Sequence, residues 1–232
     1  IVAHGGWVIR MGDPSMKPLP AMSHVIDYVH SGVRSEWMDV FLCAQCRFFI
    51  GTSSGLYVIA IAFGAPLVLT NYLPWNALWH SSKDLVLPKL FWSIREQRHL
   101  NFAEILSSPL SAGVNQSSYD RLGVEILENA PEEINDIVLE MLMRLDGKLT
   151  YSVADERLQE RFQLLTAACG TFLGPKDLMI NCQIGKDFLR KYATLLDARP
   201  QSVLCVQNQK EEKADLVENG EGFLRAARSG PR

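Results

Sequence analysis

Two short stretches near the start of the chain carry residues whose types and spacing suit the binding of an anion. The first is GTSSG, in which the hydroxyl side chains of Thr52, Ser53 and Ser54 stand between Gly51 and Gly55. Glycine lets a backbone turn tightly and approach a bound group, and the free N–H groups at a helix N-terminus attract negative charge. The stretch therefore predicts a phosphate-binding turn, although it is not a P-loop, because no Gly-Lys-Ser/Thr ends it. The alternative is a serine that caps a buried helix, which accounts for one hydroxyl but not for three.

The second stretch is WVIRMGDPS, which predicts a short strand followed by a turn. Arg10 stands at the end of that strand, where a guanidinium can hold a phosphate through two parallel hydrogen bonds. Asp13 could orient Arg10, contact a sugar hydroxyl or act as a general base. The alternative is an ion pair on the surface of a turn. We expect Arg10 and the loop from Thr52 to Gly55 to face one cleft.

The elements that must position these residues lie in the uncharged stretch from Phe48 to Asn71. A bilayer span needs about 20 apolar residues in one helix, but GTSSG and Gly64-Ala65-Pro66 interrupt this run. Between them LYVIAIAF is long enough for only about two helical turns. The pattern predicts strand, loop, helix and strand, which is a right-handed crossover between two buried parallel strands. In open α/β sheets ligands bind at the carboxyl ends of the strands, where GTSSG would lie.

The remaining pattern predicts an α/β fold: a Rossmann-like parallel sheet lobe over residues 1–90, followed by mainly helical segments over 91–205. One or two helices are expected between Ser23 and Cys46, and the clearest helix between Asn129 and Gly147, with Pro131 in its first turn. The polar, charge-rich residues 206–232 are expected to be poorly ordered.

Composition bounds the functional class. The net charge of -3 gives no sign of a nucleic-acid-binding protein. The five cysteines are an odd number, which favours a reducing compartment over a disulfide framework. Cys43 and Cys46 form a C-x-x-C, which we interpret as half-buried core thiols at the end of a helix, the alternative being a redox pair. No histidine or cysteine has metal-ligand spacing, so no tightly bound metal is expected.

The order of strand-R-x-G-D, MDVFLCAQC and FFIGTSSGLYVIAIAFGAPLVLTN resembles the C-terminal, nucleotide-sugar-binding half of GT-B glycosyltransferases. The nearest resemblance is to a bacterial family of predicted surface-polysaccharide glycosyltransferases, which has segments similar to VIRMGD, IGTSSG, FGAP and TNYLPW. GT-B fucosyltransferases are more distantly similar. The resemblance extends from Gly5 to Leu196 and is strongest from Gly5 to Pro88.

The resemblance implies a metal-independent transfer of a sugar from a nucleotide sugar to a glycan or surface-polysaccharide acceptor. Arg10 would hold the donor diphosphate, Thr52 to Gly55 would hold phosphate or ribose, and Asn71 would line the cleft. A GT-B enzyme has a second Rossmann-like lobe that is not visible here, so the chain is expected to be part of a longer protein. The expected location is the cytoplasm, with attachment to the inner membrane surface left open. The alternatives are a nucleotide-sugar epimerase and a non-catalytic nucleotide-sugar-binding or assembly module.

Overall fold

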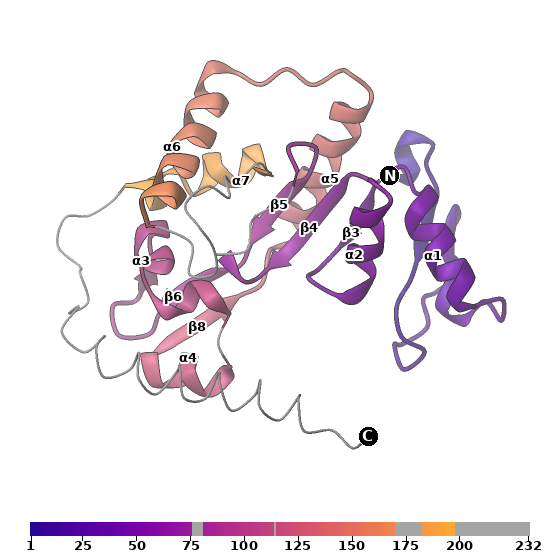
Figure 1. The fold of residues 1–232 in the computed structure, drawn as a ribbon, viewed down its shortest axis with the longest axis horizontal. Coiled ribbons are helices and arrows are strands. Elements are labelled where there is room, and N and C mark those ends of the chain that lie inside the picture. The colour runs from indigo at the N-terminus through magenta and orange to yellow at the C-terminus, as the bar shows by residue number, and fades with distance from the viewer. Residues whose placement is uncertain (76–80, 114, 170–181, 198–232) are drawn as a thin grey trace, which may run out of the picture. The chain divides into compact units, whose positions relative to one another are not determined.

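The computed structural model describes residues 1–75, 81–113, 115–169 and 182–197. The strands are β1 Val8–Arg10, β2 Val25–Asp27, β3 Phe49–Gly51, β4 Leu67–Tyr72, β5 Leu85–Pro88, β6 Leu90–Ser93, β7 Arg98–His99, β8 Val124–Leu127 and β9 Gln183–Ile184. The α-helices are α1 Glu36–Gln45, α2 Gly55–Ala62, α3 Phe102–Leu106, α4 Gln116–Leu122, α5 Pro131–Leu145, α6 Val153–Cys169 and α7 Lys186–Lys191. A parallel sheet of order β3-β4-β5-β9, flanked by helices, confirms the α/β fold (Figure 1).

The predicted strand–loop–helix–strand unit from Phe48 to Asn71 is confirmed. β3 and β4 run parallel, with Phe49 opposite Leu67 and Ile50 opposite Val68, and α2 makes the crossover between them. In β4 every residue but one is buried, as expected of a strand covered on both faces. Across the described parts of the chain, no helix combines the length and the apolar character that crossing a membrane would need.

The parallel sheet contains strands from both halves of the chain. β9 pairs with β5 in register, with Leu85 opposite Gln183 and Val86 opposite Ile184. Gln159 of α6 extends this edge, because its side-chain amide bonds both the N–H and the carbonyl of Ile184. The predicted lobe of residues 1–90 and the predicted helical continuation of residues 91–205 therefore share one sheet. The predicted tail of residues 206–232 lies outside the described residues.

The continuation also holds strands that the sequence pattern did not predict. β6 pairs antiparallel with β7 and with β8, giving a sheet of order β7-β6-β8 beside the parallel sheet. Only Lys89 separates β6 from β5 along the chain. Lys89 alone interrupts the apolar residues of the two strands, which is why the sequence pattern does not reveal two sheets there.

The N-terminal strand β1 is confirmed, and one of the one or two helices expected between Ser23 and Cys46 is confirmed as α1, but the same segment also holds a strand that the sequence pattern did not predict. β2 occupies the first part of that segment and pairs parallel with β1, with Val8 opposite Val25 and Arg10 opposite Asp27. A short run of β-branched residues suits a strand, and here pairing with β1 stabilises the strand conformation of Val25–Asp27. The helix α1 follows, and Ser35 caps it by accepting the N–H of Met38 at 3.2 Å.

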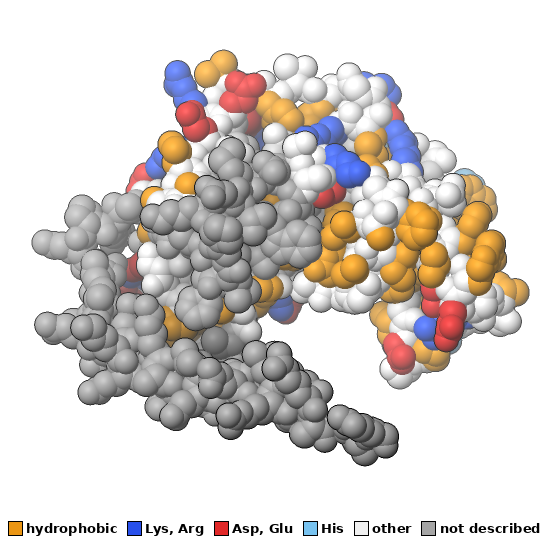
Figure 2. All heavy atoms as spheres, viewed as in Figure 1, with side chains coloured by type: hydrophobic (Ala, Val, Ile, Leu, Met, Phe, Trp, Pro, Cys, Tyr) orange, Lys and Arg blue, Asp and Glu red, His pale blue; other side chains and the backbone are white. Residues whose placement is uncertain are grey.

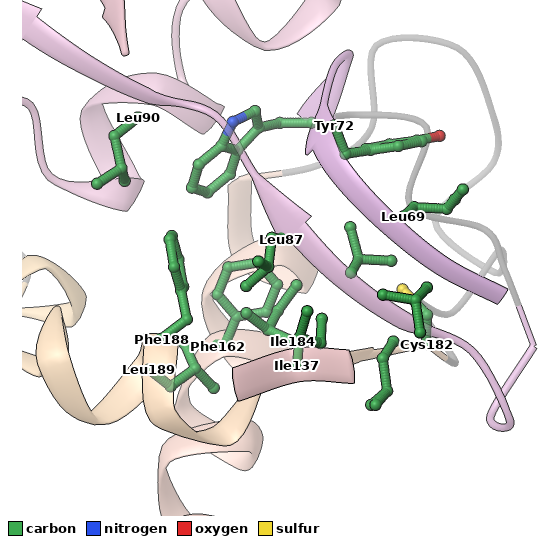
Figure 3. Packing of buried hydrophobic residues seen from close by; sticks show 14 of the residues in the cluster. Leu69, Tyr72, Leu87, Leu90, Ile137, Phe162, Cys182, Ile184, Phe188 and Leu189 are labelled. Carbon is green, nitrogen blue, oxygen red and sulfur yellow. The ribbon is translucent and has the colours of Figure 1, made fainter. Parts of the chain in front are cut away.

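The clearest predicted helix, between Asn129 and Gly147, is confirmed as α5. Glu133 reaches back to the N–H of Ala130 at 2.9 Å, so it closes the first turn, and Gly147 follows the helix with φ of 66°. α5 packs against β4 and β5. Close by, Leu87 of β5 and Ile184 of β9 gather with Ile137 of α5 (Figure 3). Burying one such side chain stabilises the fold by about 1.5–3 kcal/mol.

The two cysteines of the C-x-x-C are core thiols, as predicted. Cys43 is fully buried near the end of α1, and burial raises the pKa of its thiol to about 11. Cys46 is half-buried, and its thiol donates to the carbonyl of Cys43 at 3.2 Å. A redox pair needs a thiol whose pKa is lowered, so this geometry favours packing.

The outer faces of α1 and α2 carry exposed apolar side chains. Trp37 and Phe41 stack with ring centroids 5.2 Å apart, and Val58 and Phe63 are exposed on and just after α2. Figure 2 shows hydrophobic side chains gathered over the part of the surface where these helices lie in Figure 1. An apolar surface of this kind is typical of a face that meets another protein surface.

Candidate functional site

The GTSSG loop joins β3 to α2 at the carboxyl end of the parallel sheet, as predicted. Thr52, Ser53, Ser54 and Gly55 are all exposed. Ser54 occupies the N-cap position, but its hydroxyl makes no capping hydrogen bond. Ser54 therefore leaves this helix N-terminus without the side-chain cap that a serine at this position often supplies. The loop is therefore an exposed helix N-terminus with three hydroxyl side chains beside it.

The two glycines of this loop have different constraints. A Cβ on Gly51 would lie 2.7 Å from the ring of Phe49, so a larger residue there would displace that ring. A Cβ on Gly55 would meet nothing within 4 Å, and its backbone does not need a positive φ. Packing thus explains Gly51. It does not explain Gly55, which leaves the approach to the helix N-terminus clear.

Asn71 lies at the carboxyl end of β4, where the sequence places it, but its side chain has a structural partner. Its side-chain oxygen accepts the N–H of Asn129 at 2.6 Å, and its own N–H donates to the side-chain oxygen of Asn129 at 2.5 Å. Asn129 also donates to the carbonyl of Pro88 at 3.1 Å. Asn71 therefore ties β4 to the segment before α5.

Arg10 lies at the carboxyl end of β1, directly opposite Asp27 of β2. Its Nε lies 3.3 Å from Oδ1 of Asp27, and its Nη1 donates to the carbonyl of Lys17 at 2.8 Å. Oδ2 of Asp27 accepts the N–H of Leu19 at 2.9 Å and lies 3.0 Å from Nδ1 of His30. The hydrogen bond from Leu19, with help from His30 and Arg10, lowers the pKa of Asp27 against the opposing effect of burial.

Asp13 does not brace Arg10. It is exposed, and its Oδ1 accepts the N–H of Ser15 at 2.9 Å in the predicted turn. Hydrogen bonds from the side chain and backbone of Ser15 lower the pKa of Asp13. The carboxylate beside Arg10 is instead Asp27, which the sequence pattern did not single out. The sequence held a signal for it, since Asp27 follows two β-branched residues, but a strand of three residues is too short for its pattern to stand out.

The predicted site residues fall on two separate sheets. Arg10 and Asp13 belong to or follow β1, whereas the loop from Gly51 to Gly55 follows β3. Within the described part of the chain, no hydrogen bond or ion pair joins Arg10 to that loop. The structure thus describes an exposed helix N-terminus and a partly buried arginine, each with its own surroundings.

Another polar group ties α5 to α7. Glu133 accepts a hydrogen bond from Lys191 at 2.6 Å and from the hydroxyl of Tyr192 at 2.8 Å. Burial alone would raise the pKa of Glu133, but these hydrogen bonds and the one from Ala130 outweigh it and lower the pKa. Every acceptor contact of this buried carboxylate is thus explained by the fold. Among the described residues, no group of three or more His, Cys, Asp or Glu side chains could hold a metal ion.

Comparisons of the chain with family models, with curated proteins and with solved structures found no significant match.

Proposed function

We propose that this chain is the nucleotide-sugar-binding lobe of a GT-B-type glycosyltransferase, which moves a sugar from a nucleotide sugar to a glycan or surface-polysaccharide acceptor. The observation that carries the proposal is the exposed N-terminus of α2. It lies at the carboxyl end of a parallel strand, Ser54 does not cap it, and exposed hydroxyls surround it. This is a location where α/β sheets bind ligands and where a helix favours a phosphate.

Direct hydrogen bonds would supply most of the binding energy at this loop. The helix dipole contributes about 0.3–1 kcal/mol to an anion at an exposed terminus. Each hydrogen bond to a charged phosphate oxygen contributes about 1.5–3 kcal/mol. The backbone N–H groups of α2 and the hydroxyls of Thr52, Ser53 and Ser54 therefore matter more than the dipole. When the bond between sugar and diphosphate breaks, negative charge grows on the diphosphate, and the same donors would stabilise it.

Arg10 would supply the positive charge that the loop lacks, and Asp13 is the proposed base that takes the proton from the acceptor hydroxyl. As that hydroxyl forms its bond to the sugar, the nucleoside diphosphate leaves with the electron pair of the broken bond. The exposure of Asp13 supports this role, because an acceptor can reach its carboxylate. The remaining walls of the cleft would come from a second lobe.

Gly55→Ala tests the proposal without disturbing the fold. The added methyl meets open space in the unliganded protein, so thermal unfolding should be unchanged or slightly higher. The same methyl would obstruct a phosphate at the helix N-terminus. Calorimetric titration with GDP, UDP, CMP and ADP sugars should therefore show that one of them binds the wild type and binds Gly55→Ala at least about tenfold more weakly.

Two outcomes would contradict the proposal. Equal affinity of the wild type and Gly55→Ala would show that the donor does not bind at the α2 N-terminus. If none of these sugars binds, the ligand is not one of these nucleotide sugars. Donor binding without sugar transfer, measured with a glycan acceptor and the complete protein, would instead favour the non-catalytic nucleotide-sugar-binding module.

A further inference from the structure

The segment Gly12–Pro20, here named the strap, lies across the ends of β1 and β2. Three contacts hold it there. Its Lys17 carbonyl accepts from Nη1 of Arg10 at 2.8 Å, and its Leu19 N–H donates to Asp27 at 2.9 Å. Its Pro14 carbonyl lies 3.3 Å from Nε2 of His30. Each contact thus joins the strap to one of Arg10, Asp27 and His30.

The strap and Asp27 together close Arg10 to an incoming anion. Nη1 of the guanidinium donates to the carbonyl of Lys17, and Nε lies beside Oδ1 of Asp27. Nε and Nη2 are buried, and neither has a hydrogen-bond partner in the described structure. A phosphate that binds an arginine through two parallel hydrogen bonds needs two adjacent N–H groups facing outward. In this arrangement no such pair is accessible.

Asp27 contacts the strap as well as Arg10 and His30. Its Oδ1 lies beside Nε of Arg10. Its Oδ2 accepts the N–H of Leu19 and lies beside Nδ1 of His30. A carboxylate this close to the guanidinium also repels a second anion. Both neighbours of His30, the Asp27 carboxylate and the Pro14 carbonyl, are acceptors. His30 therefore donates to both only when both of its ring nitrogens carry a proton.

The strap has an internal turn and begins at a glycine. Asp13 closes a turn inside it, accepting the N–H of Ser15 at 2.9 Å through its side chain and that of Met16 at 3.0 Å through its carbonyl. Gly12, at its start, has φ of 147°, a conformation that other residues rarely adopt. An internal turn and a glycine at one end are compatible with a segment that moves about a hinge.

We propose that the strap is a gate over Arg10, held shut by Asp27, which opens when a diphosphate group replaces the carboxylate as the partner of Arg10. The gate rests on the proposed function, because it assigns Arg10 a diphosphate ligand. It adds a closed state in which that ligand is excluded.

The experiment pairs two variants with a matched control. Asp27→Asn removes the charge beside Arg10. His30→Ala removes the contacts to Pro14 and to Oδ2 of Asp27 but keeps the ion pair between Asp27 and Arg10. Asp146→Asn makes the same charge change at an exposed carboxylate that pairs with Arg47 and Lys148. The readouts are hydrogen exchange of the Leu19 amide, followed by NMR without ligand, and calorimetric binding of inorganic pyrophosphate.

Both strap variants should speed Leu19 exchange and tighten pyrophosphate binding, Asp27→Asn by about tenfold, the size of one charge-assisted hydrogen bond. Asp146→Asn should change neither readout, and adding Arg10→Ala to Asp27→Asn should abolish the gain in binding.

Unchanged Leu19 exchange in both strap variants, with pyrophosphate bound as in the wild type, would overturn the gate alone. Weaker binding by Asp27→Asn would also overturn it, because Asp27 would then orient Arg10 for the anion. If the strap opens but no variant binds pyrophosphate, the gate and the diphosphate role of Arg10 both fail.

Discussion

Asn71 and Asn129 exchange hydrogen bonds in both directions at the carboxyl end of the parallel sheet. Each donates its backbone N–H to the side-chain oxygen of the other, at 2.5 and 2.6 Å. Asn129 is buried, and Asn71 has a positive φ of 50°. The pair therefore fixes how β4 meets the segment that leads into α5, on the sheet edge that carries the GTSSG loop.

Two replacements of Asn71 should separate the contribution of its hydrogen bond to stability from that of its backbone conformation. Asn71→Gly keeps the backbone conformation and leaves the N–H of Asn129 without its partner, which should lower the free energy of unfolding by about 1–3 kcal/mol. Asn71→Ala should cost about 1 kcal/mol more, because alanine resists the positive φ. Urea unfolding measures both variants. Equal stability of the two would show that the backbone conformation is not strained at this position.

The packing role of Gly51 predicts a loss of stability that Gly55 does not share. A methyl at Gly51 would displace the ring of Phe49 in β3, so Gly51→Ala should lower stability by about 1–3 kcal/mol. Gly55→Ala serves as the matched control in the same thermal unfolding experiment. A Gly51→Ala protein as stable as the wild type would mean that Phe49 repacks freely.

Arg10 and Asp13 should affect different steps of the proposed reaction. Arg10→Ala should weaken donor binding by one to two factors of ten, since one charge-assisted contact is worth about 1.5–3 kcal/mol. Asp13→Asn should leave donor affinity unchanged, because asparagine can form the same turn with Ser15. It should lower turnover by roughly 10²–10⁴ if the carboxylate is the base.

Calorimetry and single-turnover transfer, measured side by side, check these two expectations. Full activity of both variants would place both residues outside the site. Asp13→Asn with normal turnover would restrict Asp13 to its turn.

Asp155 should make stability fall in acid. Hydrogen bonds from Arg190 lower the pKa of this buried carboxyl from 3.8 to about 2. A carboxyl with a lowered pKa in the folded state stabilises the protein above its unfolded pKa, and this contribution disappears between about pH 4 and pH 2. Asp155→Asn should therefore cost about 1–2 kcal/mol at pH 7, allowing for the half-exposed Arg190, and nothing near pH 2. Urea unfolding across this range measures the difference, and a constant difference would contradict the ion pair.

Glu140 should make stability depend on pH in the opposite direction. Burial raises the pKa of this carboxyl, although it accepts from Tyr151 at 2.9 Å and from the N–H of Lys186 at 2.8 Å. A raised pKa in the folded state means that its contribution is present below the unfolded pKa and is lost as pH rises through the folded pKa. Glu140→Gln should thus gain stability relative to the wild type from pH 4 upward. Thermal unfolding measured at several pH values checks this. A constant difference in midpoint temperature between the wild type and Glu140→Gln would contradict it.

The sequence alone determined the elements whose signals are local. Gly51 to Gly55 and Gly64 to Pro66 break an uncharged apolar run, so the strand, loop, helix and strand between Phe48 and Asn71 could be predicted. α5 could be predicted for the same reason, since Pro131 and Gly147 mark its ends. Such signals act within a few residues, and the tertiary structure did not override them.

Tertiary structure alone decided the contacts between distant segments. β9 is a strand of two residues, with no pattern of its own, and exists because Leu85 and Val86 pair with it. β2 is a strand of three residues that the sequence pattern did not predict, and it pairs in parallel with β1. For the same reason Arg10 has Asp27 as its neighbour rather than Asp13, which is nearer in sequence. Strand pairing depends on a partner far along the chain, and no local pattern in a single sequence records which partner that is.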